Sequence, residues 1–165
     1  MCIAVDALGT HGLACKPSAD RLSRHSFLND LVWRALIKAQ IPASREPLGL
    51  SRSDRKRPDG VTLIPWSQGK CLTWDVTVTD TLAPSHLLTS ESIAGCAAEH
   101  AAKRKESKYS GLPSSYSFVP IALETLGSVN QSGMEFLDML GTKIFSITGD
   151  ISEKAYLWQR LSMAL

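Results

Sequence analysis

Residues 71–79 alternate strictly between apolar and polar side chains, and no other feature of the sequence limits the fold as much. The apolar positions are Leu72, Trp74, Val76 and Val78. A repeat of two residues is the spacing of side chains on one face of a β-strand. We therefore predict a strand with one face packed on the core, and with Asp75 and Thr77 together on the opposite face.

The flanking segments predict a mixed α/β domain. The run GVTLIPW and the turn SQGK predict a β-hairpin with residues 71–79, and residues 43–48 predict a short edge strand. Apolar residues at helical spacing predict a helix over residues 28–39, which Pro42 ends. A helix over residues 90–110, a strand in SFVPIALETL and two C-terminal helices follow. The order α-β-β-β-α-β-α-α indicates a central mixed sheet flanked by helices.

Length and composition set outer limits on what the chain does. Its 165 residues are enough for one domain with a real core. The net charge of +2 is too small to indicate nucleic-acid binding by itself. No apolar run approaches the ~20 residues that cross a bilayer, and no basic segment precedes the short apolar stretch at the N-terminus. We therefore expect an intracellular protein without a secretory signal and without a membrane partner.

Two aspartates could form a metal site. If the hairpin turn centres near Gln68, Asp59 lies across from about Thr77 and diagonal to Asp75 on the same face, roughly 7–8 Å away at Cα. Carboxylates at this separation can share a divalent cation, which activates water and stabilises charge on a phosphate. The alternative is that Asp59 is a turn residue of Pro-Asp-Gly and Asp75 a partly exposed strand residue. An aspartate in mid-strand is unfavourable, which favours a functional role.

Two basic segments accompany the acidic pair. The first contains Arg52, Arg55, Lys56 and Arg57, and the second contains Lys103, Arg104, Lys105 and Lys108. A phosphate backbone approaching the acids would pass the first segment. Lys105, Lys108 and Tyr109 share a helix face, so a lysine there could orient water or stabilise the phosphate. Simpler explanations are a solvated charge run and an exposed helix C-terminus.

Taken in order, these motifs resemble a known family. RKRPDGV, whose Asp59 is separated from Asp75 by fifteen intervening residues, and a Lys-Tyr pair on the next helix resemble the restriction-like PD-(D/E)XK endonuclease domain. That domain lies at the C-terminal end of the reverse-transcriptase proteins of some non-LTR retrotransposons. The resemblance covers nearly the whole chain, through GTHGLAC, SRHSFLND, RPDGVTLIPW, CLTWDVTVTDTLAPSHL, SKYSGL, FVPIALETLG and ITGD.

The resemblance implies a PD-(D/E)XK core in which Asp59 and Asp75 bind Mg²⁺ or Mn²⁺. Lys108 and Tyr109 match the family's helical lysine and tyrosine, and Lys105 lies one turn earlier. The implied substrate is double-stranded DNA, nicked so that a free 3′ end can prime reverse transcription. Other implied partners are element RNA and a reverse-transcriptase domain, normally in the same polypeptide, and the implied location is nuclear.

One departure from the family pattern leaves an alternative open. Thr77 stands two positions after Asp75, where the family has lysine, so a lysine from the following helix would have to replace it. We expect a Mg²⁺-dependent DNA endonuclease. The alternative is a catalytically inactive nucleic-acid-binding relic of the same fold, and a weaker one is a protein-interaction remnant of a mobile element. Because no Tyr-X-Asp-Asp polymerase motif is present, we expect an isolated domain, a fragment or a stand-alone relative.

The family also carries a zinc knuckle before the nuclease. Residues 1–22 resemble a truncated knuckle, which leaves residues 23–165 as the endonuclease-like domain. Cys2, His11 and Cys15 could supply three zinc ligands and His25 a fourth, as a tetrahedral site requires. The alternative is a loosely packed N-terminus with free thiols.

Overall fold

The computed structural model describes residues 19–50, 56–83 and 93–165. In chain order these residues form helix α2 (Ala19–Lys38), strand β1 (Ala43–Arg45), the 3₁₀-helix η1 (Leu48–Leu50), strands β2 (Gly60–Thr62) and β3 (Cys71–Thr79), helix α4 (Cys96–Tyr109), strand β4 (Tyr116–Glu124), and helices α5 (Gln131–Thr148) and α6 (Glu153–Met163). Apart from η1, this is the predicted order. None of the described helices is long and apolar enough to cross a membrane.

Several predicted boundaries differ from those in the structure, and the backbone explains two of the differences. The edge strand ends at Arg45 because Glu46 has a positive φ of 47° and Pro47 has no N–H for a ladder. Helix α4 begins at Cys96, after Gly95 in the left-handed region with φ of 83°. Helix α2 begins at Ala19 and therefore contains residue 22, the predicted end of the knuckle-like segment.

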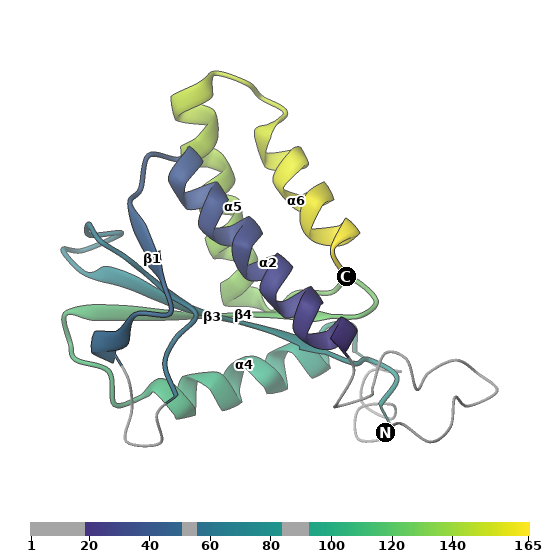
Figure 1. Ribbon diagram of the computed structural model, residues 1–165. Helices are drawn as coiled ribbons and strands as arrows, with labels where there is room; N and C mark the ends of the chain where they lie inside the picture. Colours follow the sequence, from purple (N-terminus) through teal and green to yellow (C-terminus); the bar gives the residue numbers. More distant parts are fainter. Residues whose placement is uncertain (1–18, 51–55, 84–92) are drawn as a thin grey trace.

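The four strands form one mixed sheet in the order β1-β2-β3-β4. Strands β1, β2 and β3 are antiparallel neighbours, whereas β3 and β4 are parallel and are joined through α4. Figure 1 shows α4 on one side of the sheet and α2, α5 and α6 on the other. The chain is therefore a mixed α/β domain with helices on both faces of its sheet.

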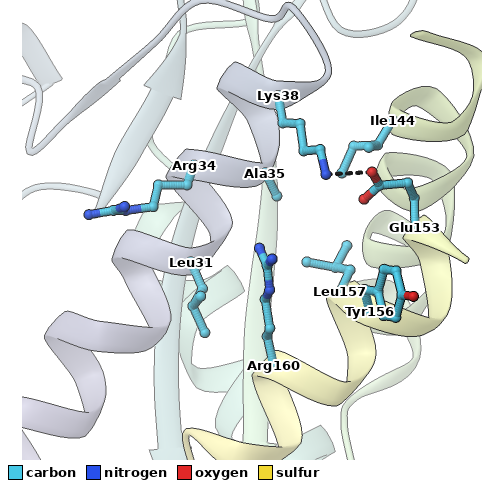
Figure 2. Close-up of a pocket in the computed structure, with 9 residues that line it drawn as sticks. All are labelled: Leu31, Arg34, Ala35, Lys38, Ile144, Glu153, Tyr156, Leu157 and Arg160. Atoms are coloured by element: carbon cyan, nitrogen blue, oxygen red, sulfur yellow. Dashed lines mark hydrogen bonds and ion pairs between the residues drawn. The ribbon is translucent and has the colours of Figure 1, made fainter. Parts of the chain in front are cut away.

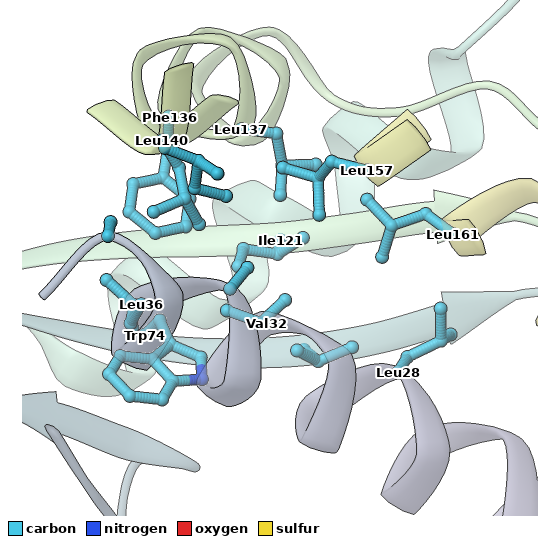
Figure 3. Close-up of a cluster of buried hydrophobic side chains, with 14 of the residues drawn as sticks. Leu28, Val32, Leu36, Trp74, Ile121, Phe136, Leu137, Leu140, Leu157 and Leu161 are labelled. Carbon is cyan, nitrogen blue, oxygen red and sulfur yellow. The ribbon is translucent and has the colours of Figure 1, made fainter. Parts of the chain in front are cut away.

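The larger core lies between the sheet and the three helices α2, α5 and α6. Figure 3 shows Trp74 and Ile121 of the sheet in one cluster with side chains of α2 and α5. Leu72, Trp74 and Val76 are fully or almost fully buried, which confirms the predicted core face of β3. Val78, at the end of the same row, is only half-buried.

The opposite face of β3 is covered as well, by the small side chains of α4. Ala98, Ala101 and Ala102 pack on Ala122 of β4. Small residues let a helix approach a sheet closely, so Asp75 on this face is only 2 % exposed. The polar side of the alternating strand is therefore an interior surface, and a carboxylate there has to be compensated.

Helices α5 and α6 are joined by a carboxylate whose charge can be tested. Asp138 accepts hydrogen bonds from Trp158 Nε1 at 2.9 Å and pairs with Lys154 Nζ at 3.0 Å. The bond from Lys154, followed by the one from Trp158, lowers the pKa of Asp138 below its ordinary value of 3.8. A lowered carboxylate pKa stabilises the fold above the ordinary pKa, and this contribution is lost as pH falls through the folded value.

Asp138→Asn is therefore expected to lower the free energy of unfolding at pH 7 by less than about 1 kcal/mol, because the pair is exposed to solvent. Asparagine can still accept the Trp158 bond, so the variant isolates the charge. Urea unfolding of both proteins from pH 7 to well below pH 3.8 should show the full difference at pH 7 and a shrinking one below pH 3.8. A difference that stays constant over that range would contradict this assignment.

Candidate metal centre

Asp59 and Asp75 lie side by side where β2 meets β3. The register pairs Gly60 with Trp74, so Asp59 comes beside Asp75. The predicted partner of Asp59, Thr77, is wrong by two positions along β3. A shift of two keeps every side chain on its face, which is why the two carboxylates still converge.

The carboxylate of Asp59 is held from two sides. The backbone N–H of Val76 in β3 donates to Asp59 Oδ2 at 2.7 Å, and His25 Nε2 of α2 is 3.0 Å from the same oxygen. The hydrogen bond to Asp59 is the largest cause of a raised His25 pKa, with burial opposing it. The ring is therefore protonated more readily than a free histidine, and its Nε2–H donates to the carboxylate.

The backbone at Asp59 is fixed by a buried polar contact. Trp74 Nε1 donates to Asn29 Oδ1 at 2.9 Å, and Asn29 Nδ2 donates to the Asp59 carbonyl oxygen at 3.5 Å. The next residue, Gly60, lies flat against the Trp74 indole, where a Cβ would overlap the ring. The Pro-Asp-Gly sequence therefore has a second role besides a turn: its glycine lets the acid approach the core.

Three side chains form a group that could hold a metal ion. One ligand atom each from His25, Asp59 and Asp75 lies within 4.8 Å of the others. Two carboxylates are a donor set that suits Mg²⁺ or Mn²⁺. The carboxylates are the pair predicted from the sequence, whereas His25 had been assigned to the N-terminal zinc site.

Two lysines of α4 reach the same buried carboxylate. Lys105 Nζ donates to Asp75 Oδ1 at 2.5 Å, and Lys108 Nζ lies 3.6 Å from Asp75 Oδ2. Lys108 also donates to the Tyr109 hydroxyl at 2.7 Å, and that hydroxyl donates to the Arg57 carbonyl oxygen at 2.7 Å. The predicted helix face of Lys105, Lys108 and Tyr109 thus points at the acidic pair.

The environment of Lys108 favours its neutral form more than water does. Burial is the largest cause of a lowered Lys108 pKa, and the charge of Asp75 opposes it. The amine keeps a cation–π contact at 4.4 Å from the centre of the Tyr109 ring. Lys108 is therefore held in a fixed place beside the carboxylate.

The predicted DNA-binding residues lie partly outside the described chain. Arg52 and Arg55 belong to residues 51–55, which the structure does not describe. Lys56 is exposed, and Arg57 is half-buried and paired with Glu46 of the segment after β1. Arg57 is the main cause of a lowered Glu46 pKa. Lys103 and Arg104 are exposed on α4.

The zinc ligands Cys2, His11 and Cys15 also lie outside the described residues. His25, the fourth, is in α2 and bonds to Asp59. One sequence signal could have indicated this position. His25 and Asn29 stand one helical turn apart beside Leu28 and Val32 of the apolar stripe. Polar residues on a buried helix face need hydrogen-bond partners, and Asp59 supplies one to His25 and one to Asn29.

Two hollows adjoin α2, and two residues that line one of them bond to the backbone of Asp59. A polar cavity of about 350 Å³ is lined by Ser26, Asn29, Arg45 and Glu46. Asn29 Nδ2 and the Glu46 N–H both donate to the Asp59 carbonyl oxygen. Figure 2 shows the other hollow, between α2 and α6, where Lys38 pairs with Glu153; no predicted site residue lines it.

Comparisons with known proteins identify no family for this chain. Its sequence matches no protein-family model, and it matches none of the curated proteins.

Proposed function

We propose that this chain is a metal-dependent DNA endonuclease with a PD-(D/E)XK-like core. The observation that carries the proposal is the meeting of two carboxylates, Asp59 and Asp75, with two lysine amines on Asp75. An acidic pair can hold a divalent cation that activates water for hydrolysis of a phosphodiester, and a neighbouring amine can stabilise the charge that develops on the phosphate. The retrotransposon type, the nuclear location and the RNA and reverse-transcriptase partners rest on the resemblance of the sequence motifs.

Asp59 and Asp75 are the residues that would hold Mg²⁺ or Mn²⁺. When bound, such a cation lowers the pKa of a water and offsets negative charge on the phosphate. His25 orients the Asp59 carboxylate through its Nε2–H, and the Val76 N–H fixes the same oxygen. The protein thus supplies two acids whose positions are set by the sheet and by α2.

Lys108 supplies the positive charge that the motif position Thr77 lacks. Its amine is 3.6 Å from Asp75 Oδ2 and is tethered through Tyr109 to the backbone that precedes Asp59. From there it can donate a hydrogen bond to the phosphate as charge develops on it. Lys56 and Arg57 lie on the same approach and would contact the DNA backbone, as would Lys103 and Arg104.

The test is conversion of supercoiled plasmid to relaxed circles. We expect nicking by the wild type with Mg²⁺ or Mn²⁺, and none with a chelator. A protein carrying both Asp59→Ala and Asp75→Ala, purified in parallel, controls for contaminating nucleases. Equal nicking by the two preparations would exclude the endonuclease.

The second candidate is a catalytically inactive nucleic-acid-binding relic. Thr77 favours it, because the family's lysine is missing two positions after Asp75. Salt-dependent binding of double-stranded DNA without metal-dependent nicking would select this candidate. If the protein neither binds nor nicks DNA, the protein-interaction role remains.

Lys108→Met is expected to slow nicking at saturating Mn²⁺ by about a hundredfold, because a donor to the developing phosphate charge is lost. Methionine keeps most of the length of the side chain. Lys70→Met, in the exposed turn before β3, removes the same charge away from Asp75 and serves as the matched control. Equal rates for the two variants in single-turnover assays would contradict the role given to Lys108.

A further inference from the structure

The buried carboxylate of Asp75 is neutralised by a cation that belongs to the protein. Its side chain is 3 % exposed, and Lys105 Nζ donates to its Oδ1 at 2.5 Å. A charge at this depth is strongly unfavourable unless an opposite charge compensates it. Lys105 therefore compensates the charge of Asp75 in the protein alone, as a bound cation does at a metal centre.

The two lysines of α4 are anchored differently. Lys108 has a tether that does not involve Asp75, since its amine donates to the Tyr109 hydroxyl, which is bonded to the Arg57 carbonyl. For Lys105, within the ranges that the structure describes, Asp75 is the hydrogen-bond partner of the amine, and the side chain remains 24 % exposed. Lys105 can thus leave Asp75 for solvent at little cost once another cation is present.

Lys105 and a divalent cation would both bind the Asp75 carboxylate. Ligand atoms of Asp59 and Asp75 lie within 4.8 Å of each other, so a cation held by the two acids would lie a few ångströms from the Lys105 amine. At such a distance two positive charges repel strongly in a buried site. Simultaneous occupation of Asp75 by Lys105 and by a divalent cation is therefore unfavourable.

We infer that Lys105 is a displaceable counter-ion that compensates Asp75 in the metal-free protein and is expelled when a divalent cation binds. Lys105 thereby sets the metal affinity of the centre, whereas Lys108 stays in place for the phosphate. This inference rests on the proposed metal centre and assigns different roles to two lysines that the sequence pattern does not separate.

The test is the affinity for Mn²⁺ without DNA, measured from the loss of the free-ion signal in electron paramagnetic resonance. Lys105→Met is expected to bind Mn²⁺ at least about tenfold more tightly than the wild type, because the competing charge is gone. Lys105→Arg keeps a charge and is expected to stay near the wild-type affinity. Lys70→Met, in the exposed turn before β3, controls for the loss of one charge and is expected to leave the Mn²⁺ affinity unchanged.

Thermal unfolding gives a second readout that keeps the inference testable if Lys105→Met is unstable. We expect this variant to have a lower Tm than the wild type in chelator and a larger rise in Tm on adding Mn²⁺. A variant that folds only with Mn²⁺ supports the inference in the same way. A variant that stays unfolded with Mn²⁺ overturns it, since the ion then does not replace the lysine.

The remaining outcomes separate this inference from the proposed function. If Asp75→Asn abolishes Mn²⁺ binding but Lys105→Met binds no more tightly than the wild type, the metal centre stands and the counter-ion role is wrong. The same holds if Lys105→Arg binds as tightly as Lys105→Met. If neither the wild type nor Lys105→Met binds Mn²⁺, the proposed metal centre itself is wrong.

Discussion

Asp75→Asn is expected to lower the rate of metal-dependent nicking by about a thousandfold or more, the size of effect seen when a residue of an interdependent catalytic set is removed. Asparagine has the shape of aspartate and can accept the Lys105 hydrogen bond through its Oδ1. It carries no charge, however, and so is a poor ligand for Mg²⁺ or Mn²⁺. Asp75→Asn should therefore lose nicking activity and keep its fold.

Three measurements distinguish this result from a general loss of structure. The far-ultraviolet circular dichroism of Asp75→Asn should match that of the wild type. Its affinity for double-stranded DNA should be equal or higher, because a negative charge has been removed near the phosphate path. Asp138→Asn makes the same chemical change on α5 and should nick at the wild-type rate. A rate for Asp75→Asn within tenfold of the wild type would remove this residue from the catalytic set.

Gly60→Ala is expected to lower the free energy of unfolding by about 3 kcal/mol, the upper end of the usual cost of overpacking. The added Cβ would overlap the indole of Trp74, which is fully buried and is bonded to Asn29. The ring has no free space to enter, so β2 or Trp74 must move. Urea unfolding at pH 7 measures the loss.

A second substitution shows whether the indole is the cause. Trp74→Phe replaces the indole by a smaller ring. It thereby removes the six-membered ring of the indole, which carries the atoms nearest the added Cβ. In this background Gly60→Ala should cost less than it does in the wild type, so the two substitutions are coupled in a double-mutant cycle. Additive effects would mean that Gly60 is required for another reason. Gly49, with open space around its Cα, provides the matched control Gly49→Ala.

Local patterns were sufficient to predict the elements of this fold and the two acids. The alternation over residues 71–79 indicated β3, and the turn at Gln68 and Gly69 has the positive φ values that a tight hairpin needs. Asp75 was singled out because an aspartate in mid-strand is unfavourable. Each of these inferences depends on neighbours within a few residues along the chain.

The features that sequence reasoning missed depend on where separate elements lie in space. The register of β2 on β3 differs from the prediction by two positions, because the chain advances six residues from Val61 to Ser67 but only three between their partners Lys70 and Thr73. The contact of His25 with Asp59 depends on the path of α2 over the sheet. The sequence therefore offered His25 only as a possible zinc ligand. The approach of Lys105 to Asp75 likewise requires the alanines that bring α4 close to β3.

The contacts that build the candidate centre span long stretches of chain. His25 and Asp59 are 34 residues apart, Lys105 and Asp75 are 30 apart, and Tyr109 and Arg57 are 52 apart. Each of these contacts closes a long loop at a cost in chain entropy, so the centre needs the packed fold that offsets this cost. Metal binding would therefore report completed folding: a nascent or partly unfolded chain would hold the same acids yet have no centre.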